Sequence, residues 1–422
     1  MKVTKNFYEH PNISGIAQLI LEIHKAQQTN HFINFSSGNP FIFSEVNNLI
    51  QHCLTVVINE KKLVPFISQY AEFSGHLGFL DELIKIYSPI FGELTHANVV
   101  ATIGSQSAIY YAAFAFITSQ KTSGTILLPQ CPDYADYAIL RSKACSLISY
   151  APIIEKTGKH SFRYKYDLDQ MDLSNIKMVL LSRPTNPSGL ILEDSELLKF
   201  SQKCEHYNIP VVIDGAYSPP IPGLVYQNGF QHICNKNVIN LGSFSKVGFA
   251  GSRVGFAIGA EEFISPIKTS QIGICLSVPK EGQFIVTEAL KSGILMNLTS
   301  TIIQPFYLKQ MLLMKQAFSE YCSDDVPYYF HESQGGMFLW LWFENCPFTN
   351  EEIWLMVKKE RIYLTPGKLF FYGLDNKEYK HQDECFRLSL TETEEHINKG
   401  MTTFAEIINK IYNKPKIKAL TA

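Results

Sequence analysis

The stretch "NVINLGSFSKVGFAGSRVGFAIG", residues 237–259, decides which fold we predict. Its two ends, residues 237–242 and 253–259, are short apolar runs bounded by glycine, which is typical of buried strands. Between them stands Lys246, surrounded by serine, glycine and small or apolar residues, with no second charge before Arg253. Two interpretations are open: an ordinary surface lysine, or an amine in a shielded site near Arg253, where its pKa falls and it becomes nucleophilic.

Similar apolar runs alternate with helical patterns on both sides of this stretch. Such alternation over about 160 residues favours a mostly parallel sheet that is covered by helices on both faces. From about residue 281 the pattern changes to several helices and two apolar strands, which predicts a smaller α+β lobe. The predicted elements of the first part are strands at 98–103, 125–129, 145–151, 177–182, 209–214, 237–242 and 253–259 and helices at 104–118 and 194–206. Those of the second part are helices near 281–292, 301–322, 350–360 and 392–412 and strands at 336–343 and 384–390.

Composition narrows the class of protein. The 422 residues are 46% hydrophobic and 18% charged with a net charge of -2, which is globular and does not favour nucleic-acid or membrane-surface binding. Nine widely spaced cysteines without a CxxC pair suggest neither a disulfide framework nor a metal site, so we expect a reducing cytoplasm. The first residues lack the apolar core of a signal peptide, and the apolar run 108–117 is too short to span a bilayer.

Polar residues stand where several predicted strands end, which is where open α/β sheets bind ligands. Each one also has an ordinary structural interpretation: Asp214 could cap a turn, "TNPSG" with Asn186 is good turn chemistry, and Arg253 could form a structural ion pair. "GSQ" before a helix could be a simple cap, although its free N–H groups also suit a phosphate. The candidates at strand ends are Gly104, Ser105, Gln106, Asn186, Asp214, Tyr217, Ser243, Ser245 and Lys246.

Taken together, these residues describe one ligand, pyridoxal 5'-phosphate. Its phosphate would lie at the helix start near Arg253 and the serines, its ring nitrogen opposite Asp214, and its aldehyde carbon at Lys246. A buried aspartate keeps the ring nitrogen protonated, which the electron-withdrawing role of the ring requires. Small residues around Lys246 let the backbone approach the phosphate closely.

The chain resembles the fold-type I, class I/II aminotransferases over nearly its whole length. The resemblance implies that Lys246 of "SFSK" carries the cofactor covalently and that Tyr134 of "PDYADY" stacks on its ring. Asn186 and Tyr217 would share its phenolic oxygen. "QYAEFSG" supplies Tyr70, which in the family reaches the phosphate in the neighbouring subunit, so the resemblance implies a homodimer. Arg387 of "FRLS" and Gly38 of "SSGNP" would bind the substrate carboxylate.

The same resemblance predicts a large cofactor-binding domain at 45–295 and a small domain formed by 1–44 and 296–422. Within the family, "GSQSAIYY", "SRPTNPSG" and "TPGKLFFYGLD" are similar to the valine–pyruvate branch, although "CLSVPKEG" (275–282) differs and Ser389 replaces an asparagine. We therefore expect amino-group transfer between a small apolar amino acid and pyruvate. Three alternatives are an aminotransferase of other specificity, a β-eliminating lyase on the same cofactor, and a non-catalytic effector-binding module. The last would need a DNA-binding segment, for which the sequence before Gly38 offers little room.

Overall fold

The computed structural model describes residues 32–60, 64, 67–70, 72–118, 123–374 and 379–413 of the chain. Its centre is a seven-stranded sheet in the order β2-β10-β9-β8-β7-β3-β4. Only β10 runs antiparallel to its neighbours, so the predicted mostly parallel sheet is confirmed. The strands are β2 (Val99–Thr102), β3 (Gly124–Leu128), β4 (Cys145–Ser149), β7 (Ile176–Ser182), β8 (Val211–Asp214), β9 (Val238–Ser243) and β10 (Gly255–Ile258).

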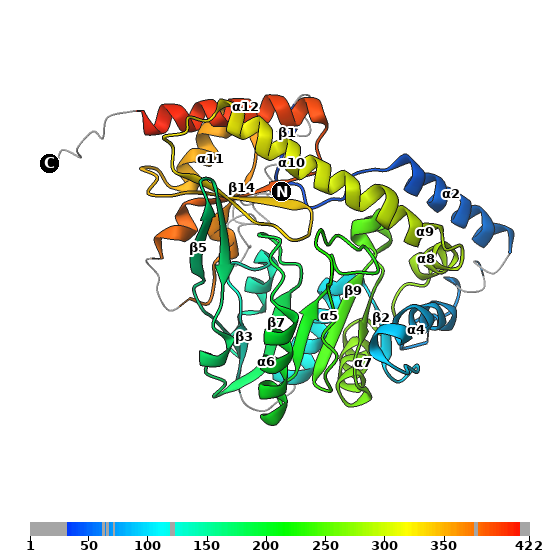
Figure 1. Cartoon of the computed structure of the whole chain (residues 1–422). Helices are drawn as coiled ribbons and strands as arrows, with labels where there is room; N and C mark the ends of the chain where they lie inside the picture. Colours follow the sequence, from blue (N-terminus) through cyan, green and yellow to red (C-terminus); the bar gives the residue numbers. More distant parts are fainter. Residues whose placement is uncertain are drawn as a thin grey trace, which may run out of the picture.

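Helices cover both faces of this sheet. Successive side chains of a strand point to opposite faces, and both faces of this sheet are apolar. Val212 packs in the same buried cluster as residues of α5 and α7, whereas Val211 and Ile213 pack with α6 on the opposite face. Towards the β2 edge, α4 and α8 cover that second face (Figure 1). The bounds are α4 (Leu77–Phe91), α5 (Gly104–Ala113), α6 (Asp194–His206), α7 (Glu261–Cys275) and α8 (Glu281–Lys291).

A second, six-stranded sheet has the order β14-β15-β12-β11-β6-β5. One of its faces packs on α10 and α12, where Phe318 and Phe404 lie with ring centroids 5.6 Å apart. Its other face presents Trp340 and Trp342 to a buried cluster shared with the first sheet. Figure 1 shows α10, α11 and α12 above this sheet. The bounds are β5 (Ile153–Gly158), β6 (Ser161–Lys165), β11 (Tyr328–His331), β12 (Phe338–Phe343), β14 (Thr365–Pro366), β15 (Cys385–Ser389), α10 (Gln304–Tyr321), α11 (Asn350–Lys359) and α12 (Glu394–Tyr412).

Several features differ from the predicted elements, and α4, α7 and β11 were not predicted at all. The hairpin β5–β6 was not predicted; it comes from the proposed large domain but pairs with β11 of the second sheet. The strand expected from residue 253 begins at Gly255, because Arg253 has a φ of 51° that an extended strand does not allow. The helix expected to continue to residue 118 changes to a π-helix after Ala113. The division into two domains stays a prediction.

The remaining α-helices and strands of the described residues are α2 (Ser44–Asn59), α9 (Ile294–Leu298), and the short strands β1 (Ile33–Asn34) and β13 (Ile362–Tyr363), which pair in parallel. Among the described residues, none of the helices has the length and hydropathy that crossing a bilayer requires.

Candidate active site

The carboxyl ends of β7, β8 and β9 open into one cavity of about 390 Å³. Their last residues, Ser182, Asp214 and Ser243, all line it, as sheet topology leads one to expect. The second sheet contributes Phe338 and Arg387. Every predicted site residue except Gly104 and Tyr70 lines this cavity. Those that line it are Gly38, Ser105, Gln106, Tyr134, Asn186, Asp214, Tyr217, Ser243, Ser245, Lys246, Arg253 and Arg387.

Lys246 lies just after β9, in a short 3-10 turn from Ser245 to Val247. Its Nζ donates a hydrogen bond to the carbonyl oxygen of Gly38 at 2.7 Å. Burial, followed by the charges of Arg387 and Arg253, lowers the pKa of the Lys246 ammonium to about 8. A lysine with this pKa is a free amine far more often near neutral pH than a surface lysine is, so it can act as a nucleophile or a base.

Asp214 is the last residue of β8, and its carboxylate is held on the side that faces the cavity. Tyr137 Oη donates to Oδ2 at 3.1 Å, and the Ala216 backbone N–H donates to Oδ1 at 3.2 Å. Burial raises the pKa of this carboxyl. A ligand that brings a positive charge to Asp214 reverses this effect and is bound tightly.

A corner of the cavity at the start of α5 is suited to an anion. Gly104 has a φ of 76°, and a Cβ there would lie 2.5 Å from Nη2 of Arg253, so a larger residue would be strained and would displace the guanidinium. Arg253 Nη1 donates to Ser245 Oγ at 3.1 Å, and Ser243 Oγ donates to the same hydroxyl at 3.0 Å. In the part of the chain that the structure describes, no carboxylate pairs with Arg253. The corner therefore combines a guanidinium, hydroxyl groups and a helix N-terminus.

Arg387 lies on β15 and is a buried cation. It donates to Asn186 Oδ1 at 3.1 Å, to the Ser36 carbonyl oxygen at 3.0 Å and to Thr365 Oγ1 at 3.4 Å. All three acceptors are neutral, and its buried Nε has no hydrogen-bond partner among the residues that the structure describes. Burial lowers the pKa of Arg387 to about 10. Such a guanidinium favours a carboxylate ligand, which supplies both the missing charge and the missing acceptor.

Aromatic rings hold the Arg387 guanidinium in place. Its central carbon lies 4.1 Å from the ring centroid of Phe338 and 5.0 Å from that of Phe370. Two tyrosines line the cavity as well. Tyr217 is buried beside Asn186, and burial raises the pKa of its phenol. Tyr134 Oη donates to Asp136 Oδ2 at 2.7 Å.

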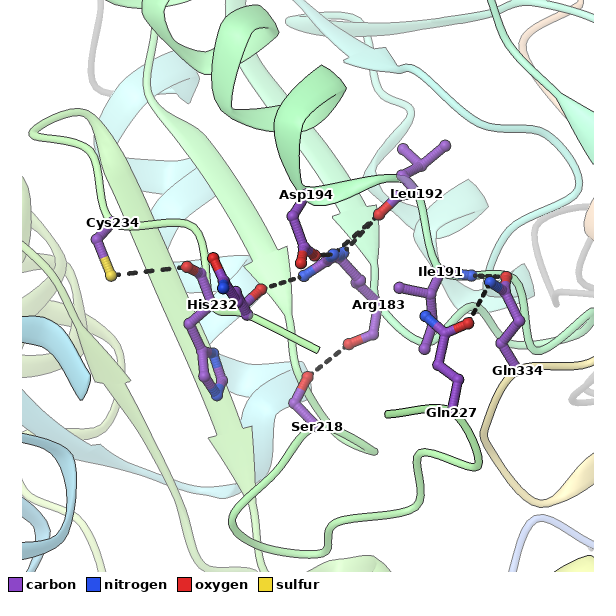
Figure 2. Close-up of polar contacts among 10 residues, drawn as sticks. Arg183, Ile191, Leu192, Asp194, Ser218, Gln227, His232, Cys234 and Gln334 are labelled. Carbon is purple, nitrogen blue, oxygen red and sulfur yellow. Dashed lines mark hydrogen bonds and ion pairs between the residues drawn. The ribbon is translucent and has the colours of Figure 1, made fainter. Parts of the chain in front are cut away.

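The loop that carries Asn186 is tied down on both sides (Figure 2). On one side the buried Arg183 side chain donates to the Leu192 carbonyl oxygen at 2.9 Å and pairs with Asp194. On the other side Gln334 Oε1 accepts from the Ile191 backbone N–H at 2.9 Å. The loop between β7 and α6 therefore has one fixed position, which fixes Asn186 against Arg387.

Sequence reasoning missed several residues that line the cavity, among them Ser36, Asn39, Asp136 and Phe338. Phe338 belongs to the apolar strand predicted at 336–343. Only the position of β12 at the cavity shows that its side chain also lines the site. Asp136 follows Tyr134 by two residues, which was the one available signal. Tyr70 lies outside the cavity with its side chain 79% exposed.

Comparisons with known proteins agree with this geometry. The family model "Aminotransferase class I and II" matches residues 30–404. Valine–pyruvate aminotransferase of Escherichia coli K12 is 30% identical over 404 residues, 94% of this chain and 96% of that protein. The crystal structure of valine-pyruvate aminotransferase from Salmonella typhimurium LT2 has a TM-score of 0.85 and 29% identity, covering 95% of this chain and 100% of that one.

A more distant structure shares the fold. Pyrococcus horikoshii kynurenine aminotransferase, solved in complex with PMP, has a TM-score of 0.76 at 20% identity and covers 94% of this chain and 95% of its own. The predicted family resemblance is confirmed by these matches. The chain belongs to the class I and II aminotransferases, enzymes that transfer amino groups with pyridoxal 5'-phosphate as cofactor.

Proposed function

We propose that this aminotransferase moves the amino group between a small apolar amino acid and pyruvate, so that valine and pyruvate give 2-oxoisovalerate and alanine. The observation that carries the proposal is the charge inventory of the cavity. Among the described residues that line it, the cations are Lys246, Arg253 and Arg387. The roles assigned below use all three, which leaves none of the described cations of the cavity for a second substrate carboxylate. The similarity to valine–pyruvate aminotransferases of two bacteria supports the same substrates.

The cavity residues fit the cofactor. We assign the phosphate to the corner of Gly104, Ser105, Gln106, Ser243, Ser245 and Arg253, where a guanidinium without a carboxylate partner and the space that a Cβ would fill support an anion. We assign the ring nitrogen to Asp214, whose buried carboxylate needs a cation. We assign the phenolic oxygen of the cofactor to contacts with Tyr217 and Asn186. Tyr134 would stack on one face of the cofactor ring. When bound, the cofactor supplies a sink for the electrons of the bond that breaks at the substrate α-carbon.

Lys246 carries out the proton movements in this proposal. Its low pKa makes Nζ a competent base, so it can remove the proton from the α-carbon of the amino acid. In the second half of a ping-pong cycle the same nitrogen returns a proton to the α-carbon of the product amino acid. Its hydrogen bond to the Gly38 carbonyl oxygen, near Arg387, supports a position beside the substrate.

Arg387 binds the α-carboxylate of every donor and acceptor. Its unpartnered Nε and neutral neighbours support a two-point ion pair with a carboxylate. Gly38 would contact the same carboxylate through its backbone. A second substrate carboxylate buried in the cavity without a cation would be strongly unfavourable. The pocket-forming stretch "FSSGNPFIF" (35–43) has no cation, whereas "NISGIAQ" (12–18) lies outside the described residues.

The proposal includes a homodimer with two shared sites. Tyr70 is 79% exposed in a single chain, and exposed apolar side chains lie near it in sequence, including Ile67 at 54% and Phe73 at 52%. Clustered apolar exposure supports a protein interface. We also propose that the enzyme works in the cytoplasm, which its nine unpaired cysteines support.

A two-substrate screen tests the proposal. Valine, alanine, 2-aminobutyrate, glutamate and aspartate are each offered as donor with pyruvate, 2-oxoisovalerate and 2-oxoglutarate as acceptors. The expected result is that small apolar donors with pyruvate or 2-oxoisovalerate have the highest kcat/KM. Differences among these donors should be modest, since one methylene group is worth only about 1–3 kcal/mol. A higher kcat/KM for glutamate would refute the proposed specificity, and release of pyruvate from a cysteine S-conjugate without an acceptor would indicate β-elimination instead.

A further inference from the structure

Asp136 lines the cavity and has no role in the proposed chemistry. It lies in the 3-10 helix η3 (Ala135–Leu140), directly after the loop that carries Tyr134. Its side chain is fixed, because Tyr134 Oη donates to Oδ2 at 2.7 Å. The carboxylate is therefore held next to a residue that we assign to the cofactor ring, and it is not a freely moving surface group.

The charge of Asp136 acts inside the cavity. Within the described ranges no lysine, arginine or histidine forms an ion pair with it. Its hydrogen-bond donor there is the neutral phenol of Tyr134. Asp136 is also one of the groups that favour the charged form of Arg387, together with Tyr217 and Tyr134. An anion that interacts with Arg387 across the cavity also interacts with a substrate bound to Arg387.

Once the cofactor and substrate groups are assigned, one acidic residue that lines the cavity has no positively charged group opposite it. Asp214 faces the ring nitrogen, and the three cations face the phosphate, the α-carboxylate and the covalent position, which leaves Asp136 as an unmatched negative charge. A substrate with only an α-carboxylate brings no second charge near it. Glutamate, aspartate and 2-oxoglutarate bring a second carboxylate into the same cavity of about 390 Å³.

We propose that Asp136 is a specificity-determining residue that excludes substrates with a second carboxylate. Two like unit charges in one cavity, at an effective dielectric constant of about 20, repel strongly enough to disfavour binding by roughly tenfold to a hundredfold. Without a further cation among the described cavity residues, a second substrate carboxylate gains no ion pair. Asp136 adds repulsion against these substrates, which is a second route to selectivity. This inference rests on the proposed function, since it explains how that specificity arises.

The test compares wild type with Asp136→Asn, which keeps the size of the side chain and an acceptor oxygen for Tyr134. We expect the ratio of kcat/KM for glutamate to that for alanine, and the ratio for 2-oxoglutarate to that for pyruvate, to rise at least about tenfold. The matched control is Asp324→Asn, which removes an exposed acid that pairs with Lys159.

A binding measurement provides a readout other than turnover. Succinate and propionate are titrated into each protein, and their dissociation constants are obtained from the change in cofactor absorbance. Asp136→Asn should tighten succinate binding at least about tenfold relative to propionate. Asp136→Ser, smaller and also neutral, serves as a second variant if the first is poorly folded by circular dichroism.

The outcomes separate the inference from the function on which it rests. If the ratio of dicarboxylate to monocarboxylate binding is the same in wild type and both variants, the role of Asp136 is refuted even when valine–pyruvate transfer is intact. If wild type does not transfer between valine and pyruvate, the proposed function fails, whatever Asp136 does. A shift of the ratio in both variants but not in Asp324→Asn supports the inference.

Discussion

Nη1 of Arg387 donates a hydrogen bond to Oδ1 of Asn186 at 3.1 Å. Arg387 belongs to the six-stranded sheet and Asn186 follows β7 of the seven-stranded sheet, so this bond joins the two sheets inside the cavity. The residue that we assign to the substrate carboxylate thereby touches a residue that we assign to the cofactor. If these assignments hold, we expect substrate binding at Arg387 and cofactor position at Asn186 to be coupled.

Replacing Arg387 by lysine should raise KM for every donor and acceptor alike, by about tenfold or more. A lysine ammonium is a point charge, so it cannot reproduce the planar fork, nor can it lie flat between Phe338 and Phe370. Steady-state kinetics with valine, alanine and pyruvate measure the change. The control is Arg163→Lys, an exposed arginine paired with Glu155. If KM increased for one substrate only, Arg387 would bind the side chain of that substrate and not the α-carboxylate that all substrates share.

Lys246→Ala should abolish turnover. Loss of a general base alone costs roughly 10²–10⁴ in rate, and loss of the covalent attachment adds to this. The variant should hold the cofactor only non-covalently. Borohydride should therefore not attach the cofactor to the chain. Transfer rates and peptide mass spectrometry after reduction measure both effects, with the exposed Lys236→Ala as control. Wild-type activity together with a reducible lysine in the variant would show that another residue carries the cofactor.

Much of this site could be predicted because buried parallel strands are short apolar runs, and the polar residues at their ends must meet at one edge of the sheet. Asp214 and Lys246 follow from that rule. Asp136, Phe338 and the hairpin β5–β6 do not, because their place depends on packing between the two sheets. β5 is largely exposed along its length and lacks the apolar run of a buried strand. Tyr70 lies outside the cavity of its own chain, so its assignment rests on the family resemblance.

The amine of Lys246 should titrate with a midpoint near pH 8 in protein freed of cofactor, because burial and two cations lower its pKa to about 8. Only the neutral amine reacts with an acylating reagent, so labelling of the Lys246 peptide should rise through pH 8. Arg387→Gln removes a cation that lowers this pKa and should move the midpoint to higher pH. Asp214→Asn removes the carboxylate that raises it and should move the midpoint lower. A midpoint near pH 10.5 in all three proteins would contradict the electrostatic account.

Arg183→Met should destabilise the fold by about 2–5 kcal/mol. The buried guanidinium donates to the carbonyl oxygens of Leu192 and Gln231 and pairs with Asp194, and methionine leaves all of these acceptors without it. Urea unfolding measures the loss. Asp194→Asn is the matched control, since it removes the ion pair but leaves both carbonyl bonds, and should cost less. Equal losses in the two variants would mean that the unpaired buried charge left by Asp194→Asn costs as much as all the interactions lost with Arg183.

A shared-site homodimer can be tested by mixing two inactive variants. Tyr70→Ala should weaken cofactor binding in the partner's site, and Lys246→Ala removes the base in its own. In a hybrid dimer both lesions then fall in one site and the other site is intact. Random reassortment of equal amounts should restore about a quarter of the wild-type activity, because half of the dimers are hybrids with one working site. No recovery after verified reassortment, or an active monomer in equilibrium sedimentation at assay concentration, would show that Tyr70 does not act across subunits.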